Sequence, residues 1–178
     1  MVHRIAVTGL PGVGKSTVVH KVIELCKNHG SMGGILTRDK RLKGKRIGFE
    51  IMDIASGTQG QLADIWGNGP RVGQYRVNLH DLDNTGAYAL EIALACDLIV
   101  VDEVGPMELQ SPKFIHDVEK VVASEKPVLA VVKLGYDHPL AQNIRRTFKI
   151  ITVTRENRDS LPAEIAEDLC YGPGTLNK

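Results

Sequence analysis

Residues 9–16 read Gly-Leu-Pro-Gly-Val-Gly-Lys-Ser and directly follow the apolar run 5–8. This spacing, between a strand and an amphipathic stretch, is typical of the phosphate-binding loop, whose backbone N–H groups and helix start hold phosphate oxygens. Lys15 is expected to reach the β- and γ-phosphates, and the Ser16 hydroxyl to ligate Mg²⁺. The motif therefore predicts a site for nucleoside triphosphates, with contacts from Gly9, Leu10, Pro11, Gly12, Val13, Gly14, Lys15, Ser16 and Thr17.

Length and charge limit the number of domains and the kinds of partner that the chain can have. The chain has 178 residues, of which 43% are hydrophobic, which suits one domain, expected over 1–171 with a patternless, frayed tail at 172–178. With 22 Lys and Arg against 21 Asp and Glu, no overall field favours nucleic acid. The start of the chain leads directly into a strand, and no apolar run approaches the ~20 residues of a membrane span. We therefore expect a cytoplasmic protein without membrane contact, and a monomer.

Hydrophobic periodicity predicts an α/β fold. Strands that alternate with helices indicate a mostly parallel sheet between two helical layers, as in phosphate-loop NTPases. The segments 33–38 and 46–54 are expected to form a β-hairpin, joined by the polar turn 41–45 and inserted after the first helix. The glycine-rich segment 56–70 predicts no regular element. The other expected strands are 75–79, 98–101, 128–132 and 150–153, and the expected helices are 15–29, 84–96, 113–123, 140–146 and 160–169.

The three cysteines, Cys26, Cys96 and Cys170, lie about seventy residues apart inside expected helices. This spacing suits neither a disulfide framework nor zinc ligation. We expect all three to be small buried apolar side chains.

Two carboxylates follow the apolar strand 98–101, at the end where ligands bind in open α/β sheets. Asp102 is placed to hold Mg²⁺ through a water, and Glu103 to act as the base that takes a proton from the attacking water. Glu103 and Lys15 are thus the expected catalytic residues. The 86 positions between Lys15 and Asp102 favour an additional strand between the phosphate-loop strand and the acidic strand, as in the RecA-like ATPase branch. The guanine-recognition pattern Asn-Lys-x-Asp is absent from the sequence, so base selectivity is expected to be weak.

Five segments carry a resemblance that runs nearly from end to end of the chain: 9–16, 37–41 with Arg46, Gly48 and Phe49, 72–77, 101–109 and 157–159. In these segments the chain resembles the small nucleoside-triphosphatase family first known from thermophiles, which includes the human cancer-related nucleoside-triphosphatase. The resemblance implies Mg²⁺-dependent hydrolysis of nucleoside triphosphates to the diphosphate and phosphate, with little base preference. The chain departs from the family pattern at Asp39, where glutamate is usual, and at Pro106, where lysine is expected, so no cationic contact is implied from that loop.

Further cations have two interpretations each. Six Lys and Arg residues lie within 38–46. They form either a solvated turn or a group of cations that covers the bound triphosphate, and Arg41 is the one to test. A nucleic-acid contact is disfavoured because no aromatic residues interleave with these cations. Arg145 and Arg146 end a helix, where they cap its dipole or place a guanidinium on the γ-phosphate. Asn157 and Arg158 follow the last strand and could contact the base or ribose.

The aromatic residues Trp66 and Tyr75 are expected to pack in the core, with base stacking as the alternative. Three functions are compatible with the motifs. The first is a Mg²⁺-dependent nucleoside triphosphatase. The second is a nucleoside or small-molecule kinase that uses the same loop, and the third is a slow nucleotide-gated binding module.

Overall fold

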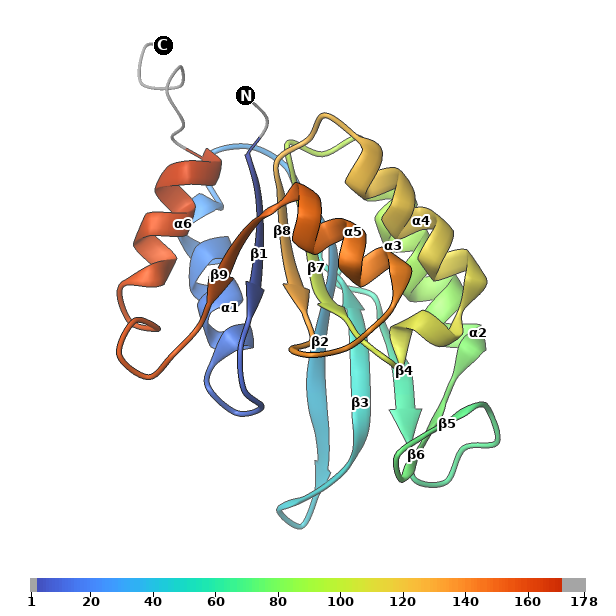
Figure 1. The fold of residues 1–178 in the computed structure, drawn as a ribbon. Coiled ribbons are helices and arrows are strands. Elements are labelled where there is room, and N and C mark those ends of the chain that lie inside the picture. The colour runs from blue at the N-terminus through green and yellow to red at the C-terminus, as the bar shows by residue number, and fades with distance from the viewer. Residues whose placement is uncertain (1–2, 171–178) are drawn as a thin grey trace.

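The computed structural model describes residues 3–170, so the expected tail at 172–178 lies outside the described residues. Their strands form one nine-stranded mixed sheet in the order β5-β6-β4-β3-β2-β7-β8-β1-β9 (Figure 1). The half from β2 to β9 is parallel, whereas β3, β4, β5 and β6 are antiparallel. The strands are β1 (Arg4–Thr8), β2 (Met32–Leu42), β3 (Lys45–Asp53), β4 (Gln59–Asp64), β5 (Arg71–Val72), β6 (Tyr75–Val77), β7 (Leu98–Val104), β8 (Val128–Val132) and β9 (Lys149–Thr152).

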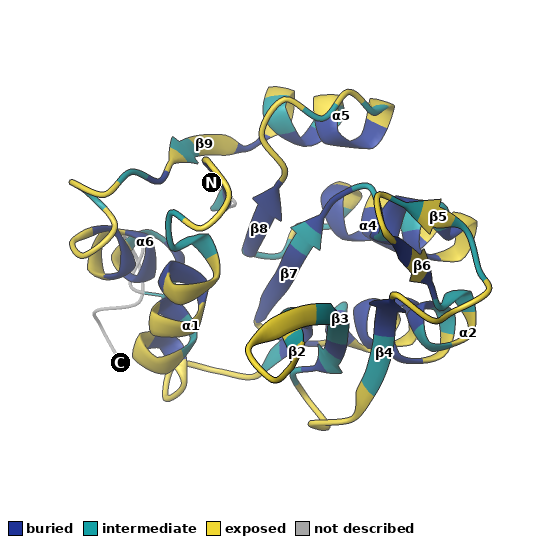
Figure 2. Cartoon of the chain, turned by 90° about the horizontal axis from the view of Figure 1, so that it is seen from below, coloured by how far each residue is buried: buried dark blue, intermediate teal, exposed yellow. Residues whose placement is uncertain are grey.

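Helices cover both faces of the sheet, which confirms the expected three layers (Figure 2). On one face, Val22 of α1 and Ile165 of α6 are fully buried in a cluster with β1, β7 and β8. On the other face, Leu90, Phe114 and Ile144 bring α3, α4 and α5 into a second cluster. No helix within residues 3–170 is long and apolar enough to cross a membrane. The helices are α1 (Lys15–Cys26), α2 (Leu79–Asp81), a π-helix (Leu82–Ala87), α3 (Tyr88–Ala93), a 3₁₀ turn (Glu108–Gln110), α4 (Pro112–Ala123), α5 (Pro139–Thr147) and α6 (Leu161–Cys170).

The strand expected between the phosphate-loop strand and the acidic strand is present, and it is β8. We expected this strand to come from the 86 positions between Lys15 and Asp102, and that expectation is wrong. The strand β2, which lies in that interval, pairs with β7 on the side away from β8. The interposed strand instead comes from the segment after the carboxylates. The carboxyl ends of β1 and β7 are thus one strand apart. In open α/β sheets, ligands bind outside these ends of the strands.

The inserted hairpin of β2 and β3 is longer than expected, because the predicted five-residue turn is only the pair Lys43-Gly44. Both residues have positive φ, 49° and 80°, which fits the tight two-residue turn that suits twisted strands. The flanking Arg and Lys residues therefore belong to the strands. Figure 1 shows this hairpin extending beyond the rest of the sheet.

The segment 56–70 was wrongly predicted to lack regular structure, since it contains β4. The glycine and the two glutamines of β4 obscure the alternation of apolar and polar residues that marks a strand. The helix expected at 84–96 begins at Leu79 instead, because Asn78 accepts a hydrogen bond from the Asp81 backbone N–H, and it continues through the π-helix. The strands β4, β5 and β6 thus extend the sheet by three antiparallel strands beyond the hairpin of β2 and β3.

The prediction for the cysteines is wrong in two of three cases. Cys26 and Cys170, the last residues of α1 and α6, form a disulfide with their Cα atoms 6.0 Å apart. Only Cys96 is a free, buried thiol, as expected. A separation of 144 residues carries no sequence signal, because only the packing of α1 against α6 brings the two side chains together.

Reducing this disulfide is expected to destabilise the protein. Cross-linking residues so far apart removes unfolded-state entropy worth about 2–5 kcal/mol, which for a chain of this size lowers Tm by roughly 5–15 °C on reduction. Thermal unfolding with and without reductant measures the change. The double variant Cys26→Ser/Cys170→Ser should unfold at the same temperature in both conditions. An equal Tm for oxidised and reduced wild type would contradict the prediction.

Candidate active site

A cleft of about 600 Å³ opens at the carboxyl ends of the central strands. One part of its wall is the loop between β1 and α1, and another is the end of β7 with Asp102 and Glu103. The structure therefore brings together the two motifs on which the expected active site depended. The loop residues that line the cleft are Gly9, Pro11, Gly12, Gly14, Lys15, Ser16 and Thr17. Leu10, 67% exposed, and Val13 do not line it.

The loop conformation requires glycine at two positions. A Cβ atom on Gly9, which has a φ of 150°, would lie 2.7 Å from the Val153 carbonyl oxygen. Gly14 precedes the first residue of α1 with a φ of 111°. A side chain would be strained or obstructed at both positions. Because glycine has none, the backbone can curl around an anion at the start of α1.

Lys15 and Ser16 begin α1 and face the cleft. The Lys15 ammonium lies 3.0 Å from the carbonyl oxygens of both Gly9 and Leu10, so it spans the mouth of the loop. One turn of backbone thus presents a cation and a hydroxyl to the same region of the cleft. This arrangement suits the β- and γ-phosphates and their metal ion.

Asp102 is 1% exposed, and its Oδ2 atom has no hydrogen-bond partner among residues 3–170. Burial, and after it the charge of Glu103, raise the pKa of Asp102 to about 7, against the opposing effects of the Ser16 hydroxyl and Lys15. A buried carboxylate oxygen without a partner, next to a hydroxyl, fits Mg²⁺. Over the same residues, no three His, Cys, Asp or Glu side chains cluster as a metal cage. Mg²⁺ suits a site with few protein ligands, because it keeps several of its bound waters and also binds substrate phosphates.

The prediction that Asp102 and Glu103 directly follow the strand is wrong. Both lie within it, because β7 continues to Val104. The pairing with β8 shifts register between Val101 and Val104, so the two carboxylates occupy an irregular step of the strand. Burial raises the pKa of Glu103, while the positive charges of Lys15 and Lys133 lower it. A partly buried carboxylate between two cations is suited to accept a proton from a bound water.

Sequence reasoning missed a third carboxyl group. Glu108 is 3% exposed, lines the cleft, and its Oε2 has no partner within the described residues. Burial and the nearby charge of Glu103 raise its pKa well above the usual value. The signal was present in the sequence, since Glu108 stands in the apolar stretch after β7, where a solvated carboxylate is not expected.

Of the candidates outside the phosphate loop and the acidic strand, Arg158 contacts the loop, donating to the Val13 carbonyl oxygen at 3.3 Å. Arg41 pairs with Asp39 at 2.7 Å on the hairpin and does not line the cleft. Asn157 fixes the turn after β9 through the Thr154 N–H at 2.8 Å and the Thr152 carbonyl at 2.9 Å. Neither base nor phosphate contact is needed to explain Asn157.

Arg145 does not simply cap its own helix. It donates to the carbonyl oxygens of Lys133 and Tyr136, at 2.8 and 2.9 Å, and so holds the loop after β8. Arg146 bonds Asn143 at 3.2 Å, and neither arginine lines the cleft. Within the described residues, the structure therefore places no guanidinium from this helix over the phosphate loop.

The two aromatic candidates differ. Tyr75 is buried, as expected for core packing, whereas Trp66 is 63% exposed, so its expected place in the core is wrong. Trp66 sits in the loop after β4, where its backbone N–H is held by Asp64 at 2.9 Å. The side chain gains little burial there because that loop lies at the edge of the sheet.

Comparison with known proteins agrees with this geometry. A family model described as NTPase matches residues 4–166. The chain belongs to this family of nucleoside triphosphatases. Its members include the nucleoside-triphosphatase THEP1 of Methanosarcina acetivorans, 54% identical over 91% of this chain and 94% of that protein. The nucleoside-triphosphatase THEP1 of Methanosarcina barkeri is 53% identical over 92% of this chain and 95% of its own length.

Two solved structures share the fold over more than nine-tenths of each chain. The crystal structure of THEP1 from Aquifex aeolicus superposes with a TM-score of 0.81 at 31% identity, over 91% of this chain and 96% of that one. The solution structure of a human cancer-related nucleoside triphosphatase gives 0.76 at 34% identity, over 92% and 95%. The family membership makes this chain a nucleoside triphosphate hydrolase, and these likenesses confirm its α/β phosphate-loop fold.

Proposed function

We propose that the chain hydrolyses nucleoside triphosphates to the diphosphate and phosphate in a Mg²⁺-dependent reaction with little base selectivity. One observation carries the proposal: the cation and hydroxyl of Lys15 and Ser16 line the same cleft as the buried Asp102 carboxyl group and the partly buried Glu103 carboxyl group. A phosphate cradle alone would serve any nucleotide-binding protein. A carboxylate beyond the metal site adds what hydrolysis requires, a base for water.

Each residue has a separate part in the reaction. The loop N–H groups and Lys15 hold the β- and γ-phosphates, and Ser16 and Asp102 hold the metal. Bound Mg²⁺ would neutralise the charge that develops on the bridging phosphate oxygens. Glu103 orients the attacking water and accepts its proton, in line with the departing diphosphate. Arg158, which packs on the loop from the β9 side, is the candidate contact for the nucleoside end.

Two observations favour water over a kinase acceptor. The curated relatives named above are triphosphatases. In addition, Arg145 and Arg146 hold other parts of the fold and do not line the cleft, so no arginine-rich lid is assembled from that helix. A slow nucleotide-gated module would use the same residues and differs only in turnover.

A phosphate-release panel tests the proposed function. The common ribo- and deoxyribonucleoside triphosphates should all be hydrolysed at similar rates with Mg²⁺, and release should fall to background when a chelator removes the metal. Hydrolysis of a single base, or hydrolysis without divalent metal, would contradict the proposal. Turnover below ~10⁻³ s⁻¹ that rises on adding a cell fraction would support the gated module, whose intrinsic rates lie near that scale.

A further inference from the structure

The cleft continues past Glu103, away from the phosphate loop. We call this part the distal half of the cleft and define it by Asp39, Arg46, Phe49, Leu62, Val72 and Met107. These residues come from β2, β3, β4, β5 and the loop after β7. In the sheet, β2, β3 and β4 lie on the opposite side of β7 from β1. The distal half therefore adjoins the γ-phosphate end of a bound nucleotide and not its base.

Four of the six residues that define the distal half have apolar side chains. Phe49, Val72 and Met107 are partly buried and pack on the core, which leaves part of each side chain facing the cleft. Neither a triphosphate nor an attacking water gains from such a wall. Apolar lining with a few fixed polar groups is instead typical of sites for small organic ligands.

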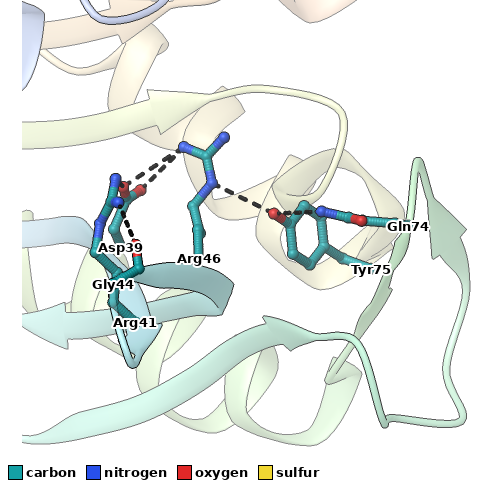
Figure 3. Close-up of polar contacts among 6 residues, drawn as sticks. All are labelled: Asp39, Arg41, Gly44, Arg46, Gln74 and Tyr75. Atoms are coloured by element: carbon teal, nitrogen blue, oxygen red, sulfur yellow. Dashed lines mark hydrogen bonds and ion pairs between the residues drawn. The ribbon is translucent and has the colours of Figure 1, made fainter.

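One polar group in the distal half is held in place from three sides. Figure 3 shows the Arg46 guanidinium between Asp39 and Tyr75. Its Nε donates to the Tyr75 hydroxyl at 3.3 Å, and one terminal nitrogen donates to the Asp39 carboxylate at 3.3 and 3.5 Å. Its central carbon lies 5.2 Å from the centre of the Phe49 ring. The Tyr75 hydroxyl also accepts a bond from Gln74 at 2.9 Å, which fixes the supporting side.

The second terminal nitrogen of Arg46 has no hydrogen bond to any residue between 3 and 170, and the side chain is 47% exposed. A guanidinium whose other donors are fixed loses little entropy on binding an anion. Carboxylates and phosphates are its preferred partners. Arg46 and Phe49 thus present one guanidinium nitrogen, free among the described residues, beside an aromatic ring, in a part of the cleft whose other walls are mostly apolar side chains.

We propose that the distal half of the cleft binds a second molecule, a small planar organic anion, next to the γ-phosphate. Its ring packs against Phe49 and Val72, and its carboxylate or phosphate group bonds Arg46. The location relative to the nucleotide rests on the proposed function. Because this ligand would stand beside the water that Glu103 orients, nucleotide binding and ligand binding are coupled, and each changes the affinity of the other.

Ligand binding to nucleotide-loaded protein tests the proposal. The phosphate loop is first filled with Mg²⁺ and a β,γ-imido triphosphate, so that probes cannot bind there. Benzoate and phenyl phosphate are the probes for the two anion types, and benzyl alcohol is the uncharged comparison. Methyl NMR shifts of Met107 and Val72 report binding in the distal half. We expect one of the two anions to bind with a dissociation constant of about 1 mM, as befits fragments of this size.

Matched variants separate Arg46 from general charge. Arg46→Met should weaken anion binding at least ~10-fold, the loss expected for a charge-assisted hydrogen bond. Lys45→Met removes the same charge one residue away, on the exposed hairpin outside the cleft lining, and should bind the probes as the wild type does. If Arg46→Met does not fold, Phe49→Leu should still weaken binding of the anion that the wild type binds, because it removes the ring.

Three outcomes overturn the proposal: no shift of Met107 or Val72 with either anion, equal anion affinity in Arg46→Met, or benzyl alcohol binding as tightly as the anions. Phosphate release by the same wild-type samples separates the two proposals. Normal Mg²⁺-dependent hydrolysis without anion binding rejects only the second site. Absence of Mg²⁺-dependent hydrolysis rejects the proposed function itself.

Discussion

Replacing Glu103 with glutamine is expected to lower phosphate release by at least ~10²-fold while triphosphate affinity stays close to that of the wild type. The substitution keeps the size and polarity of the side chain but removes its ability to take a proton from water. The phosphates are held by other groups, the loop N–H groups and Lys15, so binding does not require Glu103. Phosphate release under saturating nucleotide, together with calorimetric binding, measures the two effects separately.

Glu108→Gln is the matched control for this experiment. Both carboxyl groups flank Gly105 in the same cleft, since a Cβ atom there would lie 2.7 Å from a Glu103 oxygen and 3.1 Å from a Glu108 oxygen. Burial raises the pKa of Glu108 well above its usual value and so favours the neutral carboxyl group, which glutamine imitates, so phosphate release should change far less. Unchanged turnover in Glu103→Gln would remove Glu103 from the role of base.

The elements predicted correctly from the sequence share one property, a buried face with a clear period. The strand β8 and the helix α4 agree with the expected ranges 128–132 and 113–123. A fully apolar run marks the strand, and a serine cap followed by proline marks the start of the helix, so few alternatives remain. The antiparallel strands β4 and β5 lie near the edge of the sheet and are partly exposed. Because β4 includes a glycine and β5 has only two residues, their alternation is weak. Their existence depends on pairing with the long hairpin, which local sequence does not encode.

The candidate site divides in the same way. The phosphate loop is a continuous segment of eight residues, so its members can be recognised from the sequence alone. Arg46 and Phe49 stood in the matched family segments, yet their relation to Tyr75 arises only when β3 and β6 flank β4 in the sheet. The Cys26–Cys170 disulfide is the extreme case, because its two helices meet only in the finished fold. What the sequence could not predict is contact between distant segments.

Replacing Lys15 with alanine is expected to weaken triphosphate binding roughly 10- to 100-fold, the loss of one or two charge-assisted hydrogen bonds. The ammonium lies at the mouth of the loop, 3.0 Å from the Gly9 and Leu10 carbonyl oxygens, where the β- and γ-phosphates are expected. The fold should be retained because Lys15 is the first residue of α1 and alanine favours helix. Titration with a fluorescent triphosphate measures the change.

Lys21→Ala removes an equal charge from the same helix and serves as the control. Lys21 is half exposed, lies 3.8 Å from Asp159 and does not line the cleft, so its loss should leave affinity unchanged. A diphosphate should lose less affinity than a triphosphate in Lys15→Ala, because it lacks the γ-phosphate that the ammonium contacts. If triphosphate affinity is the same in Lys15→Ala and Lys21→Ala, the loop does not bind phosphate in the way its sequence indicates.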